Sequence, residues 1–322
     1  MTLPYRRLLL ALDGTPWAEH LLEVAERWTA PGRSTVALVH VVEEGGPKRV
    51  HGAAHLHEAN AAAHYLESCA ERLRNSGRST VCLLRQGQSR DVARTLVAAA
   101  DEQESEALLL ATHGRVDPRR WFRGSIAQQV LARTRRDVLQ LTPRSPAPAP
   151  GPRSLLVPLD GENAHETALL RALWLARESD GNVFLVHVLP GPEETDGLGV
   201  LRARFAPHAD RILQRRRARL RAEYLARCAR LAGPGSVRVR TLIETGDPAG
   251  VLAGLTHRLG IDLVILASHG RHGLASLGRE HLPGRLIERL DVPILMVAAG
   301  PRTGVGPGTS ASSRAGPSPP TG

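Results

Sequence analysis

The sequence predicts an α/β fold made of two tandem, doubly wound parallel-sheet domains. Three observations support this prediction: a length of 322 residues, an internal repeat, and short apolar runs that alternate with amphipathic stretches. Because domains commonly hold about 150 residues, the length alone favours two of them. Strands that alternate with helices favour a parallel sheet covered by helices on both faces.

The internal repeat divides the chain into two copies of one unit. Five short segments of the first copy recur in the same order in the second, between 147 residues (Asp13 to Asp160) and 159 residues (Tyr65 to Tyr224) further on. The pairs are 8–14 (LLLALDG) with 155–161 (LLVPLDG), 37–41 (ALVHV) with 184–188 (FLVHV), Tyr65 and Cys69 with Tyr224 and Cys228, Gln86-Gly87 with Thr245-Gly246, and 109–115 (LLATHGR) with 265–271 (ILASHGR). Ordered agreement of this kind indicates a duplication.

The repeat also sets the predicted domain boundaries. These are a first domain at 1–142, a linker at 143–153, a second domain at 154–298 and a tail at 299–322. The linker is rich in Pro and Ala, which is typical of a stiff, extended connection. The tail is mostly Gly, Pro, Ser and Thr, so it has little apolar surface to bury and is expected to be disordered.

The elements of the first copy follow from the spacing of its apolar residues. A strand is expected at 7–12, because 8–12 form a continuous apolar run typical of a buried strand, and 18–30 place Leu21, Leu22 and Trp28 at helical spacing. The later elements are expected at 35–42 (strand), 53–75 (helix), 79–85 (strand), 90–100 (helix), 107–111 (strand), 125–135 (helix) and 137–141 (strand). The last strands of the two copies, 138–141 and 293–297, are expected to pair within one chain as a pseudo-dimer, which would hide both edges.

Composition disfavours several classes of protein. The longest apolar stretches, such as 8–12 and 263–267, are far shorter than the roughly 18 residues of a membrane span. The start of the chain lacks the cleavage site of a secretory signal, and three cysteines fit a reducing cytoplasm. The net charge is +10, but Lys48 is the one lysine among 42 basic residues, as in GC-rich coding. A nucleic-acid partner is therefore not expected, since that needs a clustered basic patch.

The carboxyl ends of the strands carry the residues of chemical interest, because ligands of doubly wound sheets bind there. The segments 11–14, 40–42, 86–90 and 111–125 are expected to converge at this edge. Asp13 ends the first strand, where its carboxylate can accept a hydrogen bond from the exocyclic amine of a base. The alternative is a role at the entrance of the following helix, where Pro16 would stand early.

The segment 111–125 predicts an anion site. Gly114 ends a strand, where the missing Cβ lets a backbone N–H approach a phosphate. Gly124-Ser125 precedes a helix whose first N–H groups favour an anion, although Ser125 with Gln128 also has the form of a capping box without a ligand. The arginines of this loop either neutralise phosphate or are solvated, and one carboxylate, Asp117, is weak evidence for a divalent cation. The arginines are Arg115, Arg119, Arg120 and Arg123.

Together these segments resemble the universal stress protein family, as a tandem two-domain member, from about Arg7 to Val297. The family's ATP-binding pattern, Gly-x2-Gly-x9-Gly-Ser/Thr, resembles Ala111-Thr-His-Gly114-x9-Gly124-Ser125. The resemblance implies an adenine nucleotide alpha hydrolase-like fold that binds ATP and usually dimerises through its last strand. It implies the following site: adenine held by Asp13 and the backbone of Val41, ribose lined by Ala11 and Ala111, and phosphates held by Gly114, Gly124 and Ser125.

The two copies depart from this pattern to different degrees. Ala111 stands where the family has its first Gly, which adds one methyl group near the ribose. The second copy keeps Asp160, Val188 and Gly270, but nine residues after Gly270 it has Glu280-His281 in place of Gly-Ser. A carboxylate about 4 Å from a phosphate is repulsive. The second domain is therefore expected to bind ATP poorly or not at all, with Pro283 as the first residue of a shortened helix. Binding of an uncharged adenosine-like ligand, or a role only as a structural partner, is left open for this domain.

Other groups of residues receive structural interpretations. His51, His55, His57 and His64 lack a nearby Cys or paired carboxylate, so a solvated helix start is favoured over a metal site. Six arginines between Arg211 and Arg221 indicate a solvated basic face, or else a contact with an acidic partner, on a helix with Ile212, Leu213, Leu220 and Tyr224 as its apolar stripe. Cys69 and Cys228 are expected to be buried. His113 and His269 have no positioned Ser or Cys nucleophile beside them.

The sequence thus predicts a cytoplasmic, non-enzymatic stress-response sensor or regulator that binds ATP, with Mg²⁺ as an optional companion, in its first domain. A protein partner of unknown identity is expected to read the bound state. An ATP-splitting enzyme of a related fold and a nucleotide-free structural or interaction module are the alternatives; the Ser-Gly-Gly-x-Asp-Ser loop of the former is absent from 11–16. Slow ATP hydrolysis and association into homodimers are left open.

Overall fold

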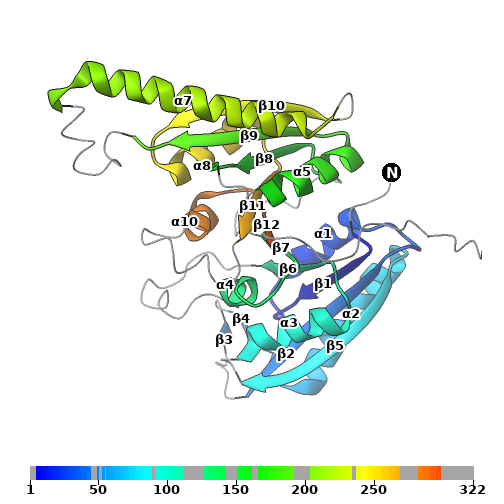
Figure 1. Ribbon diagram of the computed structural model, residues 1–322. Coiled ribbons are helices and arrows are strands. Elements are labelled where there is room, and N and C mark those ends of the chain that lie inside the picture. The colour runs from blue at the N-terminus through cyan, green and yellow to red at the C-terminus, as the bar shows by residue number, and fades with distance from the viewer. Residues whose placement is uncertain are drawn as a thin grey trace, which may run out of the picture.

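The computed structural model describes residues 5–44, 49–50, 53–54, 56–88, 91–111, 126–141, 151–161, 166–191, 204–233, 237–268 and 282–298. In this part of the chain, two α/β units share one ten-stranded sheet with the strand order β10-β9-β8-β11-β12-β7-β6-β1-β2-β5. Figure 1 shows the units one above the other, joined where β12 meets β7. The predicted fold class, two tandem doubly wound parallel-sheet domains, is confirmed.

The first unit follows the predicted order of elements. Its elements are β1 (Arg7–Ala11), α1 (His20–Trp28), β2 (Thr35–Glu44), β3 (Arg49–Val50), β4 (Ala53–Ala54), α2 (Ala59–Asn75), β5 (Ser79–Gln88), α3 (Val92–Glu102), β6 (Ala107–Ala111), α4 (Ile126–Leu131) and β7 (Asp137–Leu141). The helix expected at 53–75 begins only at Ala59, because 53–54 pair with β3. The helix expected at 125–135 ends at Leu131, where Arg133 and Thr134 both donate their N–H to Val130 O and turn the chain toward β7.

The second unit repeats this plan. Its elements are β8 (Ser154–Pro158), α5 (Glu166–Ser179), β9 (Asn182–Leu189), α7 (Pro207–Arg230), β10 (Arg238–Thr245), α8 (Pro248–Leu259), β11 (Leu263–Ser268), α10 (Leu282–Arg289) and β12 (Ile294–Ala298). Pro283 is the second residue of α10 rather than the first. A proline is tolerated there because the first N–H groups of a helix have no partner within it.

The last strands of the two units pair with each other, as expected from the sequence. Within each unit, the strands of the ten-stranded sheet pair in parallel, whereas β7 and β12 are antiparallel, with Leu139 opposite Leu295 and Gln140 opposite Ile294. This pairing removes two strand edges that would otherwise expose unpaired backbone groups. The same pairing makes the helices of equivalent position lie on one face of the shared sheet. Hence α1, α2, α5 and α7 cover a continuous buried cluster that includes residues of both units.

A buried ion pair joins the units beneath these helices. Arg171 of α5 places its Nε 2.8 Å from Oδ2 of Asp137, the fully buried first residue of β7. The hydroxyl of Tyr5 donates to the same oxygen over 3.2 Å. The guanidinium of Arg171 lies 4.9 Å from the ring centroid of Trp174, which meets Tyr5 edge to face. Because the two charges come from different units, their pairing favours one relative placement of the units.

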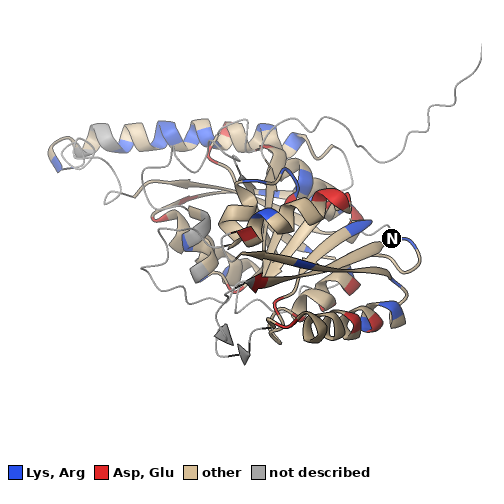
Figure 2. Cartoon of the chain, turned by 90° about the horizontal axis from the view of Figure 1, so that it is seen from below, with Lys and Arg blue, Asp and Glu red and all other residues tan. Residues whose placement is uncertain are grey.

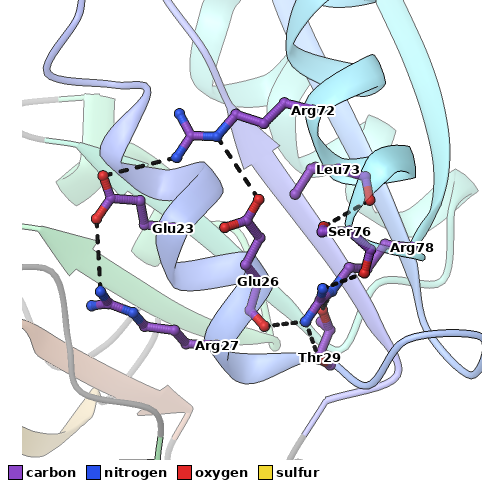
Figure 3. Close-up of polar contacts among 8 residues, drawn as sticks. All are labelled: Glu23, Glu26, Arg27, Thr29, Arg72, Leu73, Ser76 and Arg78. Atoms are coloured by element: carbon purple, nitrogen blue, oxygen red, sulfur yellow. Dashed lines mark hydrogen bonds and ion pairs between the residues drawn. The ribbon is translucent and has the colours of Figure 1, made fainter.

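The amino ends of the strands are fastened by polar contacts between helices. Figure 3 shows Arg72 of α2 between Glu23 and Glu26 of α1, with nitrogen-to-oxygen distances of 3.9 and 3.8 Å. Arg78, which leads into β5, donates to the carbonyl groups of Glu26 and Thr29 at the end of α1. These contacts lie at the start of the parallel strands, so they leave the opposite, carboxyl edge to carry a ligand.

The long helix α7 differs from the sequence prediction in its apolar stripe. Of the predicted stripe, Ile212 and Leu220 are more than half exposed, whereas Leu213 is half-buried and Tyr224 packs against the core as expected; Leu225, outside the predicted stripe, is fully buried. Figure 1 shows why: the first turns of α7 run past the end of the strands that it covers, so no sheet lies beneath them. Figure 2 shows that basic residues recur along this helix. Four arginines of the predicted basic face are exposed, whereas Arg221 is half-buried and packs on Gly161, so it does not belong to that face.

Candidate functional site

The carboxyl ends of β1, β2 and β6 meet where the strand order reverses. From β1 the chain proceeds to β2 and β5 on one side, then crosses to β6 and β7 on the other. The register sets Ala11 beside Val39, and Leu10 beside Leu109, so Ala11 and Ala111 end neighbouring strands. Val41 follows two residues after Val39 in β2. Open α/β sheets bind their ligands at such a switch point.

Asp13 lies half-buried just beyond the end of β1. Its Oδ1 accepts hydrogen bonds from the backbone N–H of Thr15 (2.9 Å) and the Thr15 hydroxyl (2.7 Å). The Thr15 hydroxyl oxygen in turn accepts from the N–H of Ala18 over 3.2 Å. Asp13 therefore shapes the turn that enters α1, as the structural alternative predicted. A carboxylate has about four acceptor sites, so this turn is compatible with a further donor from a ligand.

The side chain of His40 links three segments of the chain next to Asp13. Its ring is buried, with Nδ1 2.7 Å from the carbonyl oxygen of Leu12 and Nε2 2.9 Å from that of Leu56. The N–H of Leu12 also donates to Val39 O over 2.9 Å. The histidine side chain thus links β2, the end of β1 and the segment that precedes α2. Both ring nitrogens face carbonyl groups, which is a structural role.

Leu56 and Tyr65 also shape this edge, and sequence reasoning did not assign either residue to it. Gly14 has a φ of +85°, and a Cβ there would lie 2.6 Å from Cδ1 of Leu56, so the leucine packs directly on this glycine. Tyr65 of α2 has a pKa raised well above its ordinary value, chiefly by burial, with Cys69, Glu19 and Asp13 adding to the effect. Tyr65 was visible in the sequence as a repeated residue, whereas nothing local marked Leu56.

The expected phosphate contacts lie outside the described residues. This concerns Gly114, Gly124, Ser125 and Gly270, together with the loop arginines, Asp117, His113, His269 and the pair Glu280-His281. The helix α4 is described from Ile126, the residue that follows Ser125 in the chain. The adenine and ribose residues of the first domain are brought together at one edge, and their contact with a ligand stays a prediction.

The second domain repeats the backbone of this edge. The N–H of Leu159 donates to Val186 O over 2.8 Å, and Nδ1 of His187 lies 2.6 Å from Leu159 O, as in the first domain. Asp160 is exposed and Val188 is half-buried at the ends of β8 and β9. The two domains therefore share these hydrogen bonds as well as the repeated sequence motifs.

An acidic residue at the start of α8, Asp247, links that helix to α10. Asp247 caps α8 by accepting from the N–H of Gly250 over 3.0 Å, and it pairs with Arg285 (2.6 Å) and Arg289 (2.7 Å) of α10. Partial burial alone would raise the pKa of Asp247, but the hydrogen bonds from Arg285 and Gly250 outweigh it and lower that pKa. The carboxylate is therefore held ionised in the folded protein.

The cysteines, and the other side chains that could bind a metal, show no reactive arrangement among the described residues. Cys69 and Cys228 are buried, as expected, and burial raises the pKa of both thiols. Among the described residues there is no group of three or more His, Cys, Asp and Glu side chains placed to hold a metal ion. The described helices include none with the length and apolar character needed to cross a membrane.

Comparison with known proteins assigns both halves of the chain to one family. The model of the universal stress protein family matches residues 4–141 and again residues 152–298. A search of curated proteins found no significant match.

Solved structures agree in fold. A universal stress protein from Archaeoglobus fulgidus DSM 4304 is 15% identical, with a TM-score of 0.63 over 91% of this chain and 96% of that chain. A protein of unknown function from Pseudomonas aeruginosa PAO1 is 13% identical (TM-score 0.56, 92% and 93% covered). A putative universal stress protein from Pseudomonas aeruginosa UCBPP-PA14 is 16% identical (TM-score 0.53, 92% and 94% covered). At these identities the likeness concerns the fold alone.

Proposed function

The chain belongs to the universal stress protein family, and from this premise we propose that its first domain binds an adenine nucleotide, namely ATP. The observation that carries the proposal is the meeting of Ala11, Asp13, Val41 and Ala111 at the switch point between β1 and β6. Asp13 would accept from the amine of adenine, the backbone of Val41 would contact the same base, and the two alanines leave room for ribose. Gly114, Gly124 and Ser125 would receive the phosphates, with or without Mg²⁺.

We further propose that the bound nucleotide is a signal and not a substrate. Support comes from His40, the residue before Val41 in β2, whose two ring nitrogens both face backbone carbonyl groups. It is therefore not placed to act as a general base. Binding would stabilise the first domain by mass action, and a cytoplasmic protein partner of the stress response would respond to the change in its surface.

The adenine contact can be tested with Asp13→Asn. The asparagine keeps an oxygen for Thr15, and it replaces the other carboxylate oxygen with an amide donor, which faces the amine of adenine unfavourably. A hydrogen bond to a charged group contributes about 1.5–3 kcal/mol, so calorimetric titration should show ATP binding weakened about 10- to 100-fold. Inosine, which carries a carbonyl oxygen in place of that amine, should bind the variant better than adenosine does.

Asp160→Asn is the matched control, because it makes the same change at the equivalent position of the second domain. It should leave ATP binding unchanged. Equal affinity of wild type and Asp13→Asn for adenosine would contradict the proposed base contact. Multiple turnover of ATP, with or without Mg²⁺, would contradict the proposed signalling role.

A further inference from the structure

Helix α7 is longer than the equivalent helix of the first domain, α2. The repeat aligns Tyr65 of α2 with Tyr224 of α7, 159 residues further on, so the first residue of α2, Ala59, aligns with Ala218. Helix α7 nevertheless begins eleven residues before Ala218. Residues 207–217, here named the α7 extension, are therefore an addition of the second domain, and they span about 16 Å at 1.5 Å per residue.

The α7 extension makes no core contact that the structure describes. None of its described side chains is buried, and the first buried side chain described in α7 is Leu225. In α2, by contrast, Ala62 of the first turn is already buried. Figure 1 shows the start of α7 projecting past the strand ends of the second domain. The extension is therefore not needed to complete the core, and its exposed side chains can contact another molecule.

The charge of the α7 extension is mainly positive. Residues 207–217 contain four arginines and one aspartate. Arg211, Arg215 and Arg219 follow at four-residue spacing, so they share one side of the helix, where like charges repel one another. Arg219 pairs with Glu223 over 3.1 Å, whereas within the described part of the chain neither Arg211 nor Arg215 has a carboxylate partner. Carboxylates of a partner at the same spacing would remove this repulsion.

Exposed apolar side chains accompany these arginines and indicate the class of partner. Ile212 is 55% exposed, Leu220 is 57% exposed, and Phe205, just before the helix, is 74% exposed. The phosphates of a nucleic acid would pair with arginines but would leave these side chains in water. A helix that lies in a membrane surface keeps its apolar and charged faces apart, whereas Ile212 shares its face with Arg215 and Arg219. Protein interfaces combine apolar side chains with arginine, so a protein is favoured.

The acidic residues of the chain itself are a poor match for this surface. Glu23 and Glu26 of α1 both pair with Arg72, and Glu67 of α2 pairs with Arg74. These carboxylates are neutralised within the first domain, as the close-up in Figure 3 shows for α1. A second copy of the chain would have to break such pairs, so a different protein is the expected partner.

We propose that the α7 extension, with Arg219 and Leu220 beside it, is a docking surface for an acidic helix of a protein partner. The carboxylates of that helix follow the four-residue spacing of Arg211, Arg215 and Arg219, and its aliphatic side chains cover Ile212 and Leu220. The surface belongs to the second domain and is tested without nucleotide. This proposal and the proposed nucleotide site of the first domain can therefore fail independently.

The first test uses a synthetic helical peptide as the probe, with glutamates at positions i, i+4 and i+8 and leucines beside them. Fluorescence anisotropy should show that the full-length protein binds it about 10-fold more tightly than the same peptide with glutamine in place of glutamate, since each exposed ion pair contributes a factor of up to about 5. High ionic strength should reduce this preference. Equal affinities for the two peptides, or no binding of either, would overturn the proposal.

Variants of the protein locate the binding surface. Arg215→Gln should weaken binding of the glutamate peptide about 3-fold, and Arg230→Gln, which changes an exposed arginine at the other end of α7, should not. Ile212→Gln should weaken binding of both peptides, whereas its matched control Leu231→Gln, at a side chain that is 48% exposed, should not. Equal effects of a variant and its control would refute the docking surface.

Two further measurements decide between this proposal and its competitors. The melting temperature of Ile212→Gln should equal that of wild type; a lower value would show that Ile212 packs within the protein, and would overturn the proposal. A DNA duplex of mixed sequence and vesicles of phosphatidylserine serve as the other anionic probes. Tighter binding of either than of the glutamate peptide, or self-association that Arg215→Gln abolishes in sedimentation velocity, would assign the surface to another partner and overturn the proposal.

Discussion

Replacement of Arg171 by Met should strongly weaken the junction of the two domains. Arg171 Nε lies 2.8 Å from the carboxylate of Asp137, whose side chain is 0% exposed. Without the arginine, Asp137 keeps the hydroxyl of Tyr5 at 3.2 Å but loses its opposite charge. Removal of one partner from a buried pair costs about 3–5 kcal/mol. At about 2–4 °C per kcal/mol, the melting temperature should fall by at least about 6 °C.

The loss should depend on pH in a defined direction. Burial raises the pKa of Asp137 above its ordinary value of 3.8, although Arg171 and Tyr5 act in the opposite direction. The native carboxyl therefore takes up a proton more readily than the unfolded one, and its contribution to stability falls as the pH rises through the folded pKa. Arg171→Met raises that pKa further. Urea unfolding should thus show a larger deficit at about pH 8 than at about pH 5.

Two further variants decide whether the lost charge pair causes this effect. The triple variant Arg171→Met, Asp137→Leu, Tyr5→Phe removes all three polar groups, and it should recover most of the stability because apolar replacement of a whole buried pair is often neutral. Arg94→Ala removes a pair with Asp91 from an arginine that is 77% exposed, and it should cost at most about 1 kcal/mol. A triple variant as unstable as Arg171→Met would show that packing, and not charge, accounts for the loss.

Three smaller perturbations complete the predictions. Gly14→Ala should destabilise the folded protein by about 1–2 kcal/mol. The loss should exceed that of Gly32→Ala, because both glycines have a positive φ but only Gly14 has Leu56 against the added Cβ. Equal melting temperatures of the two variants would refute the contact with Leu56. Asp247→Asn should lower the free energy of unfolding by about 1 kcal/mol at neutral pH. Because the folded pKa of Asp247 is lowered, the carboxylate stabilises the fold above its ordinary pKa of 3.8, and this contribution is lost as the pH falls through the lowered folded pKa. A stability deficit of the variant that persists in acid would contradict this. His187→Gln should flatten the loss of stability as the pH falls below about 6.5, because the lowered pKa keeps the native ring neutral while the unfolded one is protonated; unchanged urea midpoints against pH would count against it.

Much of the fold was predictable because its signals are local. Most central strands of the shared sheet, such as β6 (Ala107–Ala111), are short apolar runs, and a run of this kind is recognisable without knowledge of its neighbours. The duplication also made the pairing of β7 with β12 predictable, since both copies end on a strand of the same kind. For the same reason Ala11, Asp13 and Ala111 could be placed at one edge, because parallel strands end together.

The errors arose where distant parts of the chain compete with local preference. The alanine-rich stretch before Ala59 has helical propensity, but 53–54 pair with β3 and Leu56 packs on Gly14, so the helix starts later. Ile212 and Leu220 have the spacing of a buried stripe, and they are exposed because the helix extends beyond the sheet. Spacing predicts which residues share a helix face, whereas burial depends on what lies beneath that face.

The sequence by itself determined the duplicated α/β scaffold and the acidic strand ends, Asp13 and Asp160, because apolar periodicity and repeated motifs are encoded in short windows. Only the tertiary structure decided what lies against each of these ends: Leu56 on Gly14 in one domain, and Arg221 on Gly161 in the other. Arg221 is 60 residues from Gly161 in the chain. Contacts of that range depend on the length and rotation of a packed helix, which no local pattern of residues records.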